Sequence, residues 1–490
     1  MIPLGLDEIV RVISARSIGT TRAVNITGVT IDSRAAATGD LFFALQGTRT
    51  DGHDFVSDAF ERGAYGCVVS RPIEPDDSPV TAGKPVLLVT NVVAALGRLA
   101  AYHRQQISAT TIAVTGSNGK STVRAMIDHV LSTRLTGRGA IKSYNNELGL
   151  PLTLLSCNSS DAYLVAEIGS NAPGEIAALA RMADPQIGVV TGIDPAHLEG
   201  LGTVEGVAAE KLSLLDHLRE GGLAVVNFDC PLVRGHLAQR RSRQVVTFGF
   251  HESADVRVTD VEPSDGGVRF RLNDRLAIHV PLLGSHNAIN AAAALAVCRR
   301  MKFGEDEIVE ALATFQPLPL RLNMRRIGPL RVLEDCYNAN PGSLRAAAAV
   351  LCAADDARRR IAVLGDMMEL GEQTAAWHER AGRELADAGV DWVVGVGEQM
   401  RAVAVGAKSA GHGTQTTCYP TTDAVCEDFP SRLGEGDLVL VKGSRSMQLE
   451  RLVTVIDAAW QDRGRGVGDQ SPDIARSADA ANVSQAVSGA

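Results

Sequence analysis

The segment TIAVTGSNGKST, residues 111–122, combines residue types that can hold phosphate groups. Gly116 and Gly119 would let the backbone approach a polyphosphate, and Lys120 would add a positive charge. An apolar β run precedes the glycines and a helical pattern follows them, so amides at the helix N-terminus would point at the anion. The same residues could form an ordinary strand-to-helix turn, but the order of strand, glycines, lysine and hydroxyls favours a phosphate loop.

The hydroxyl residues of this loop indicate a metal ion beside the phosphates. Ser117 and Asn118 occupy the turn, and Ser121 or Thr122 opens the helix where its oxygen could ligate Mg²⁺. The spacing GxxGKS is shorter than the common GxxxxGK[ST] loop, because Val114 stands where the first glycine would be. This departure excludes a routine assignment to the GTPase-like families.

An acid, an imidazole and an amine follow downstream. Glu167 ends the run AYLVAE, and His197 follows the run IGVVTGI. In a parallel sheet both would open onto the edge that carries the phosphate loop, where they could bind Mg²⁺ directly or through water. Glu167 could instead cap a helix or form a salt bridge, and His197 could be a turn histidine. By its own chemistry Lys211, in AAEKLSLLDHL, has the character of a solvated helix lysine.

The elements that position these residues alternate along two long stretches. From about residue 110 to 318, β runs such as TTIAVTG, AYLVAEIG and GLAVVNFD alternate with helical patterns, which is typical of a parallel sheet covered by helices. DVRVTDV, GVRFRL and LAIHVPL alternate with period two and predict an inserted antiparallel unit. A second series from about residue 330 predicts a Rossmann-like shape, but its VVGVGEQM lacks a full GxGxxG fingerprint for NAD.

Length and composition set the number of domains. At 490 residues the chain is too long for one hydrophobic core, and its 45% hydrophobic and 21% charged residues are ordinary for a globular protein. We therefore expect an α/β protein of three domains: a small mixed domain at 1–105, a central parallel-sheet domain with the phosphate loop at 106–318, and a Rossmann-like domain at 319–462. Residues 463–490 have the composition of a disordered tail.

Charge, cysteines and the first residues exclude several classes of protein. A net charge of −9 without long Lys and Arg runs argues against a nucleic-acid partner. Eight scattered cysteines without a CxxC pair indicate free thiols in a reducing compartment. The start MIPLGLDEIV is acidic where a signal peptide would be basic, and no run approaches a membrane span. We expect a cytoplasmic protein that binds no nucleic acid and does not insert into membranes.

Motifs spread over most of the chain resemble those of the Mur ligases. TGSNGKST is similar to the family's short TGxxGK[ST] loop, and TGVTIDSR with GDLFFALQGTRTDGHDF is similar to its UDP-binding domain. NNELGLPLTLL, AEIGSNAPGEI and PAHLEGLG, then DCYNANPGS, VLGDMMELG and VKGSRSM, resemble the members that add D-alanyl-D-alanine. The resemblance implies a UDP-binding domain, a central ATPase domain and a C-terminal Rossmann-like ligase domain.

The resemblance also implies ATP and two Mg²⁺ ions as cofactors. Lys120 would contact the ATP phosphates, Ser121 and Glu167 would hold one Mg²⁺, and His197 would help to hold the second. Lys211 falls where the family carries a carbamylated lysine, which would turn a cation into a carboxylate-like ligand for that second ion. The resemblance therefore reverses the interpretation of Lys211 as a solvated helix lysine.

Two asparagines match positions around the adenine. Asn287 and Asn290, in GSHNAINAAAALAV, match the family's HNxxN motif. Their spacing of three would place both on one helix face, behind a Ser285 cap. The alternative is that they are two polar residues on a helix of small residues.

Two further positions match residues around the phosphates and the ribose. Arg321 matches the arginine that reaches the γ-phosphate, and Asp335 matches the acidic residue near the ribose. The family usually has glycine before that arginine, whereas this chain has Leu320. Without the resemblance, Arg321 would be a surface charge and Asp335 a strand-end cap.

Residues around the two substrates come from all three expected domains. The ones that the resemblance implies are Ser33, Arg34, His53, Asn145, Asn146, Asn338, Asn340, Lys442, Ser444 and Arg445. A structural turn is nearly as good an interpretation of Ser444.

The implied reaction joins D-Ala-D-Ala to UDP-N-acetylmuramoyl-tripeptide in peptidoglycan precursor synthesis, with a monomeric enzyme. The tripeptide carboxylate would attack the γ-phosphorus of ATP to give an acyl phosphate, and the amine of D-Ala-D-Ala would then displace phosphate. Three alternatives stay open: a sibling ligase adding the third amino acid, whose DNPR-type motif is absent; a Mur-like nucleotide-binding module without ligase activity; and a P-loop kinase. The third residue of the tripeptide, lysine or diaminopimelate, is undetermined.

Overall fold

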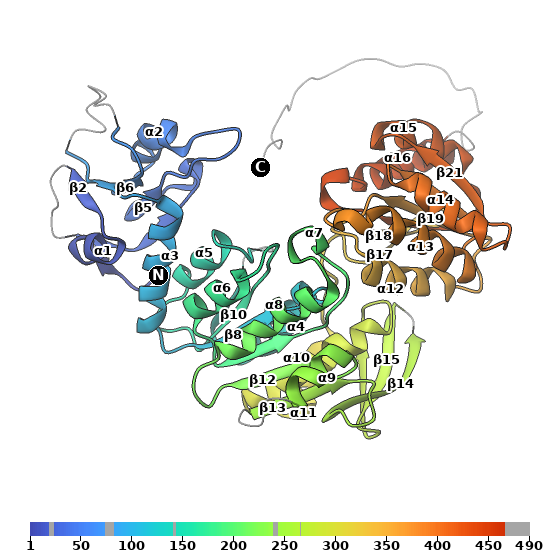
Figure 1. Ribbon diagram of the computed structural model, residues 1–490, viewed down its shortest axis with the longest axis horizontal. Coiled ribbons are helices and arrows are strands. Elements are labelled where there is room, and N and C mark those ends of the chain that lie inside the picture. Colours follow the sequence, from blue (N-terminus) through green and yellow to red (C-terminus); the bar gives the residue numbers. More distant parts are fainter. Residues whose placement is uncertain (19–23, 74–82, 141–143, 239–243, 265, 466–490) are drawn as a thin grey trace, which may run out of the picture.

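Three main β-sheets, each with its own helices, follow one another along the chain (Figure 1). The computed structural model describes residues 1–18, 24–73, 83–140, 144–238, 244–264 and 266–465. The predicted α/β class is confirmed. Among the residues described, no helix combines the length and apolar composition needed to cross a bilayer.

The N-terminal region is a small mixed sheet. Its strands, in sheet order, are β2 (Arg16–Ile18), β7 (Val86–Leu88), β6 (Gly66–Val69), β5 (Asp40–Phe43) and β4 (Gly28–Thr30). Among the described strands of this sheet, only β2 and β7 pair antiparallel, and β1 and β3 form a separate antiparallel pair. The remaining elements are β1 (Leu4–Gly5), α1 (Leu6–Ile13), β3 (Asn25–Ile26), η1 (Ser33–Ala35), η2 (Gly52–Phe55) and α2 (Val56–Glu61). Runs such as LFF and GCVV form the sheet interior because both of their faces are buried.

Helix α3 (Val92–Gln106) joins this region to the next. Asn91 caps the helix, since its side chain accepts a hydrogen bond from the amide of Ala94 at 2.9 Å. Apolar residues of α3 share one core with α1 and with α5 (Gly149–Leu155) and α6 (Glu175–Ala183) of the central region. The first two regions are therefore packed against each other.

The central sheet has nine strands and carries the predicted alternation. Their order is β16 (Leu276–Val280), β15 (Gly267–Leu272), β14 (Val256–Ser264), β13 (Gln244–Gly249), β12 (Leu223–Asn227), β11 (Ile187–Val190), β8 (Thr110–Thr115), β10 (Tyr163–Glu167) and β9 (Gly137–Gly139). From β14 to β9 in this order, β8 included, neighbouring strands pair parallel, whereas β15 pairs antiparallel with both β14 and β16. The predicted antiparallel unit is confirmed, as an extension of one sheet edge.

Helices cover both faces of this sheet because successive strand side chains point to opposite faces. On β8, Ile112 and Val114 contact the core under α4 (Lys120–Ser132), α10 (His286–Arg300) and α11 (Glu305–Ala313). Ala113 faces the opposite core, with α5 and α6. The other central helices are α7 (Leu198–Leu201), α8 (Val204–Asp216) and α9 (Pro231–Ala238). The sheet is consequently buried on both faces.

The C-terminal sheet has six strands with helices on both faces. In order they are β17 (Asn323–Ile327), β18 (Leu330–Asp335), β22 (Asp437–Lys442), β19 (Arg359–Gly365), β20 (Trp392–Val396) and β21 (Gln415–Tyr419). Only β17 and β18 pair antiparallel. The helices are α12 (Pro341–Cys352), η3 (Gly371–Gln373), α13 (Thr374–Asp387), α14 (Met400–Ser409), α15 (Thr422–Asp428), η4 (Phe429–Arg432), η5 (Arg445–Met447) and α16 (Glu450–Arg465). This agrees with the predicted Rossmann-like shape.

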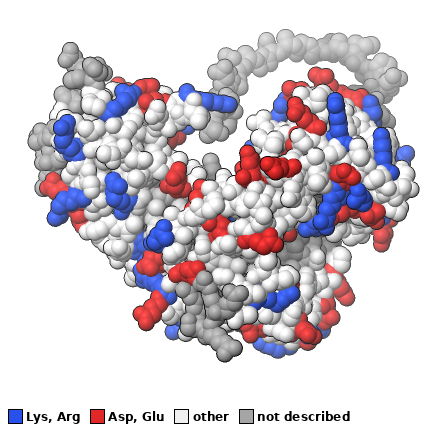
Figure 2. Space-filling view, in the orientation of Figure 1, with Lys and Arg blue, Asp and Glu red and all other residues white. Residues whose placement is uncertain are grey.

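The end of the chain differs from the expectation at one point. Helix α16 continues to Arg465, so residues 463–465 are helical rather than part of the predicted tail. The rest of that tail, 466–490, lies outside the described residues. Figure 2 shows Lys and Arg interspersed with Asp and Glu on one face, which is hollowed between the N-terminal and C-terminal regions.

Candidate active site

The loop after β8 is shaped by two glycines. Gly116 has φ +148° and Gly119 has φ +82°, conformations that side chains disfavour. A Cβ on Gly116 would lie 2.0 Å from Thr191 Oγ1, and one on Gly119 would lie 2.5 Å from Asn290 Oδ1. The loop therefore passes too close to its neighbours for any side chain at these positions. Helix α4 begins directly after it, at Lys120.

The side chain of Lys120 lies along this loop, at the N-terminus of α4. Its Nζ donates hydrogen bonds to the carbonyls of Gly116 at 2.7 Å and Ser117 at 3.4 Å. Burial lowers the pKa of Lys120, whereas the Glu167 carboxylate opposes that shift. Ser117 fixes the loop, because its hydroxyl donates to the carbonyl of Asp194 and accepts from its amide, both at 2.9 Å. The loop is thus preorganised around its lysine.

Ser121 is the centre of a polar network that reaches the C-terminal region. Its hydroxyl donates to Glu167 Oε2 at 2.8 Å and accepts from Arg321 Nη2 at 3.1 Å. Asn145 Nδ2 donates to the other oxygen of Glu167 at 3.0 Å. Glu167 is 1% exposed, at the carboxyl end of β10 beside the phosphate loop, as the parallel-sheet argument predicts. The network brings the two oxygens expected at a first Mg²⁺ into direct contact.

Arg321 reaches this network through an unusual turn. Leu320 and Leu322 have φ values of +59° and +53°, which cost roughly 1 kcal/mol each for residues with a Cβ. Leu320 thus adopts the conformation that glycine favours, so the turn forms although the glycine typical of the family is missing. The guanidinium lies 4.0 Å from the centre of the Tyr337 ring. That stacking and the bond to Ser121 hold Arg321 in the cavity.

The predicted asparagine pair on α10 is brought together. Asn290 Nδ2 donates to Asn287 Oδ1 at 2.9 Å, and Asn287 Nδ2 donates to the carbonyl of Leu283 at 2.8 Å. Beside them, burial lowers the pKa of His286 to about 4, so this imidazole is neutral near pH 7. The expected Ser285 cap is wrong. Ser285 precedes the helix, but its helical backbone angles leave its side chain without a capping bond.

An ion pair closes the opposite side of the cavity. Lys442 Nζ donates to Asp335 Oδ2 at 2.6 Å and to the carbonyl of Asn338 at 2.8 Å. The two charged residues end the paired strands β22 and β18, at directly opposed positions. Lys442 is 2% exposed, and such a buried charge needs the partner that Asp335 provides.

A pair of amides links the phosphate loop to the C-terminal region. Asn118 Nδ2 donates to Asn340 Oδ1 at 3.2 Å, and Asn340 Nδ2 donates to Asn118 Oδ1 at 2.8 Å. Asn340 also caps α12, because its Oδ1 accepts from the amide of Ser343 at 2.9 Å. Asn118 contacts Asp194 Oδ2 as well, at 2.9 Å. These hydrogen bonds therefore fix the position of the phosphate loop relative to the start of α12.

His197 forms the second such link. Its Nδ1 lies 2.5 Å from Oε2 of Glu369, which follows β19 in the C-terminal region. That hydrogen bond lowers the pKa of the Glu369 carboxyl. Sequence reasoning missed Glu369, although it lies within the VLGDMMELG motif.

Lys211 is fully buried, which contradicts the solvated-lysine interpretation. Among the described residues, none offers its Nζ a hydrogen-bond partner. Burial, with a smaller contribution from the positive charge of Lys120, lowers the pKa of Lys211 to about 7. A buried, unpartnered amine that is partly neutral near pH 7 has the chemistry needed to form a carbamate. Burial without a hydrogen-bond partner disfavours the ammonium form of Lys211.

Most of these side chains line one cavity of about 450 Å³ between the central and C-terminal regions, but Lys211 and Glu369 are not among its lining residues. Of the expected site residues it contains Ser117, Asn118, Gly119, Lys120, Ser121, Thr122, Asn145, Glu167, His197, Asn287, Asn290, Arg321, Asp335, Asn338, Asn340 and Lys442. The prediction did not include Asn171, Asp194, Asn227, His286 and Tyr337, which also line it. His286 and Tyr337 lie inside motifs that the sequence already singled out. In the part of the chain that is described, no group of three or more His, Cys, Asp and Glu side chains could hold a metal ion.

Five expected residues of the last two regions lie outside the wall of this cavity: Gly116, Asn146, Lys211, Ser444 and Arg445. Asn146 Oδ1 accepts from the amides of Leu148 and Gly149, at the start of α5. Ser444 Oγ donates to the carbonyl of Asp366 at 2.8 Å, which agrees with a structural turn. Arg445 pairs with Glu450 at 2.5 Å on the surface.

The three expected N-terminal residues lie in the first sheet region. His53 is buried, with Nδ1 2.6 Å from Asp51 Oδ1 and Nε2 accepting from the amide of Ser70 at 2.9 Å. Ser33 is also buried, and Arg34 extends into solvent beside Asp32. Of the three, only Arg34 presents a charged side chain outward.

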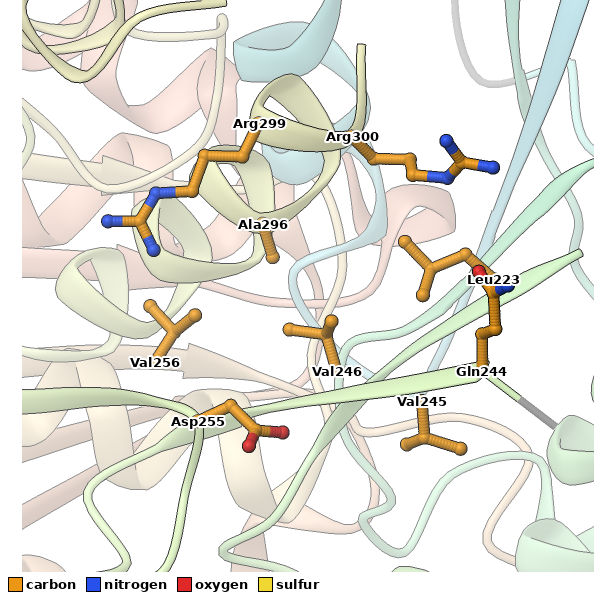
Figure 3. Close-up of a pocket in the computed structure, with 9 residues that line it drawn as sticks. All are labelled: Leu223, Gln244, Val245, Val246, Asp255, Val256, Ala296, Arg299 and Arg300. Atoms are coloured by element: carbon orange, nitrogen blue, oxygen red, sulfur yellow. The ribbon is translucent and has the colours of Figure 1, made fainter. Parts of the chain in front are cut away.

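A second cavity, of about 580 Å³, contains none of the expected residues. Figure 3 shows a floor of valine side chains from β13 and β14, with Arg299 and Arg300 extending away from each other above it. Arg299 is paired with Glu305, and Asp255 accepts from the amide and hydroxyl of Thr247. Two of its four polar side chains, Asp255 and Arg299, are thus already bonded.

Comparison with known proteins agrees with the geometry of the first cavity. Family models match residues 25–104 (Mur ligase family, catalytic domain), 114–298 (Mur ligase middle domain) and 320–445 (Mur ligase, glutamate ligase domain). The UDP-N-acetylmuramoyl-tripeptide--D-alanyl-D-alanine ligase of Bacillus subtilis is 33% identical over 87% of this chain and 92% of its own length. The chain belongs to the Mur ligase family. The Escherichia coli ligase of the same name is also 33% identical, over 93% and 99% of the two chains.

Solved structures of family members have the same arrangement of sheets. MurF from Acinetobacter baumannii matches with a TM-score of 0.84 and 29% identity, over 93% of this chain and 99% of that one. MurF from Thermotoga maritima, solved in complex with ADP, matches with a TM-score of 0.76 and 27% identity, over 89% and 99%. The predicted three-part Mur ligase architecture is thereby confirmed.

Proposed function

We propose that this chain is an ATP-dependent ligase that joins D-alanyl-D-alanine to UDP-N-acetylmuramoyl-tripeptide in cytoplasmic peptidoglycan precursor synthesis. The observation that carries the proposal is the convergence of a phosphate loop, Glu167, Arg321 and the Asp335–Lys442 pair on one cavity. The names of the similar Bacillus subtilis and Escherichia coli ligases support the choice of substrates.

The reaction begins when the tripeptide carboxylate attacks the γ-phosphorus of ATP and ADP leaves. An acyl phosphate results. The amine of D-Ala-D-Ala then attacks the acyl carbon, and phosphate leaves as the peptide bond forms. Lys120 and Arg321 stabilise the negative charge that spreads over the transferring phosphoryl group. Asn287 and Asn290 hold the adenine, and Asp335 binds the ribose, so the nucleotide lies between two domains whose packing excludes water.

The metal ions belong to the same proposal. Mg²⁺ bound there supplies positive charge that neutralises phosphate oxygens. Ser121 and Glu167 would hold one ion, and His197 with carbamylated Lys211 would hold the other. The proximity of Ser121 and Glu167 and the unpartnered buried amine of Lys211 support these assignments. The carbamate removes a buried positive charge and offers two oxygens instead.

Each of the three domains has its own part in the proposed reaction. We assign 1–105 to binding of the UDP end of the precursor, 106–318 to ATP, and 319–462 to completion of the ligase site. Ser33, Arg34 and His53 would act at the uridine diphosphate. Buried His53 shapes the loop, whereas Arg34 supplies charge.

A product assay tests the function directly. Purified enzyme is mixed with ATP, Mg²⁺, D-Ala-D-Ala and UDP-tripeptides ending in lysine or in diaminopimelate, and the products are weighed by mass spectrometry. We expect a UDP-pentapeptide and one ADP for each bond formed. ATP hydrolysis without an amide product would contradict the ligase, and a stable phosphorylated tripeptide would indicate a kinase. Tripeptide formation from a UDP-dipeptide and a free amino acid would indicate the sibling ligase.

A further inference from the structure

Glu369, in the C-terminal region, contacts a short segment of the central region. It lies between β19 and η3, and its carboxylate oxygen is 2.5 Å from His197 Nδ1. Its backbone carbonyl also accepts a hydrogen bond from the amide of Glu199 at 3.1 Å, at the start of α7. Both its side chain and its main chain therefore hold the same short segment.

The backbone at this contact is constrained on both sides. His197 has φ +56° and Glu369 has φ +64°, and neither is glycine. Such conformations are strained for residues with a Cβ and persist only where surrounding contacts determine them. Gly371, two residues on, allows the approach, since a Cβ there would lie 3.2 Å from Glu199 Cα. The two segments are thus fitted closely to each other.

The contact determines which nitrogen of His197 is free. A carboxylate beside Nδ1 favours a proton on that nitrogen, which leaves Nε2 as the acceptor of a ring that lines the cavity. A carboxylate that accepts from the far nitrogen of a metal-binding histidine fixes the ring and makes it a better ligand. Glu369 is placed to do this only while the C-terminal region is packed on the central one.

We propose that Glu369 is a positioning residue that completes the second cation site when the C-terminal domain closes on the central domain. The inference rests on the proposed function, in which His197 helps to hold that cation. Closure would then be coupled to cation affinity, and an open enzyme would hold the second ion weakly. Premature cleavage of ATP before the domains meet would be reduced for the same reason.

Three variants distinguish loss of the His197 orientation from general loss of folding. Glu369→Ala removes the partner of His197, and Glu369→Gln keeps an acceptor oxygen of the same reach without the charge. Glu372→Gln is the matched control, because this exposed carboxylate lies three residues away in η3. Circular dichroism and gel filtration check that each variant is folded.

Mn²⁺ binding provides a readout that does not depend on turnover. Electron paramagnetic resonance counts free Mn²⁺ during titration of each protein saturated with a non-hydrolysable ATP analogue. We expect two sites in the parent and in Glu372→Gln. In Glu369→Ala, one site should weaken about 10-fold or more, with a smaller loss in Glu369→Gln. Affinity for the analogue without metal should not change, and activity of Glu369→Ala should recover at high Mn²⁺.

Each other outcome contradicts a definite part of the proposal. Two unchanged Mn²⁺ sites in Glu369→Ala would overturn the role of Glu369 and leave the ligase intact. One site in a parent enzyme that still forms the pentapeptide would overturn the second cation site and the inference with it. A folded parent that forms no pentapeptide at any Mn²⁺ concentration would overturn the proposed function itself.

Discussion

At the scale of single residues, Lys120 is the first test of the ATP site. Among the described residues its Nζ donates hydrogen bonds to loop carbonyls alone, so Lys120→Ala should leave the fold intact. Loss of its charge at the phosphates should lower the rate of ATP cleavage by about 10²-fold or more. Steady-state kinetics measure this effect, with Lys408→Ala on the exposed side of α14 as control. Full activity in a folded Lys120→Ala protein would exclude the phosphate-site assignment.

Lys211 is the residue at which the sequence and the family resemblance disagree most. We expect Lys211→Ala to be nearly inactive. In the parent, activity should fall in CO₂-depleted buffer at mildly acidic pH. The carbamate forms from the neutral amine, and a pKa lowered to about 7 means that this form decreases as pH falls below about 7.

Native mass spectrometry should detect the CO₂ adduct in the parent and not in Lys211→Ala. A short carboxylic acid in the buffer should restore part of the activity of that variant, because it can occupy the vacated space. Near-parental turnover of Lys211→Ala in CO₂-free buffer would disprove the bridging role.

At the scale of elements, the start of α12 combines a helix cap with a contact to the phosphate loop. Asn340→Asp keeps the acceptor for Ser343 but loses the amide that donates to Asn118. We expect nearly unchanged stability and a higher KM for ATP. Asn340→Ala should also lose about 1 kcal/mol of stability, because the cap is gone.

Thr421 caps α15 away from this cavity and provides the control. Thr421→Ala should lose about 1 kcal/mol of stability without any change in the KM for ATP. Urea denaturation and ATP titrations measure the two effects. An equal rise in KM for both caps would show that stability, rather than the Asn118 contact, affects ATP binding.

The loop before η2 depends on one carboxylate. Hydrogen bonds from the amide and ring of His53 lower the pKa of Asp51 to about 2. Because the folded pKa lies below the unfolded one, this carboxylate stabilises the fold above about pH 4, and the contribution is lost as pH falls through about 2. Asp51→Asn should therefore reduce stability at pH 7, and its difference from the parent should shrink in acid.

Urea denaturation at several pH values checks this expectation. Asp54→Asn is the control, since that carboxylate pairs with Arg71 and is largely exposed. A difference between Asp51→Asn and the parent that stays constant down to about pH 2 would contradict the role of the charge.

At the scale of the whole molecule, nucleotide should tighten the packing of the last two domains. The cavity that we assign to ATP has walls from both of them, linked by the Asn118–Asn340 and His197–Glu369 pairs. A ligand that binds only the packed arrangement stabilises it, by about 2.7 kcal/mol at 100 times its dissociation constant. Hydrogen exchange should slow in residues 116–122 and 338–343.

Two controls belong to the hydrogen-exchange measurement. Exchange in β14 and β15, away from the cavity, should not respond to nucleotide, and Lys120→Ala should show weaker protection at equal nucleotide concentration. Protection confined to the central domain would mean that nucleotide binds without the C-terminal domain.

Much of the architecture could be predicted from the sequence because its signals are local. Strand β8, the loop after it and α4 are encoded within residues 110–132 by an apolar run, two glycines and a helical period. The same alternation predicted β18, α12, β19 and β22. The spacing of Asn287 and Asn290 sufficed to place them on one face. Parallel pairing then required Glu167 and the loop to share an edge.

Only the tertiary structure decided which distant residues meet. Glu369 is 172 positions from His197, and Asn340 is 222 positions from Asn118, separations over which no periodicity carries information. The burial of Lys211 was likewise invisible, because its helix pattern does not show that α6, α7, α9 and β11 pack around α8. Local patterns fix the elements, since helix and strand periods depend on neighbouring residues. The site depends on packing between domains, which is a property of the assembled surfaces.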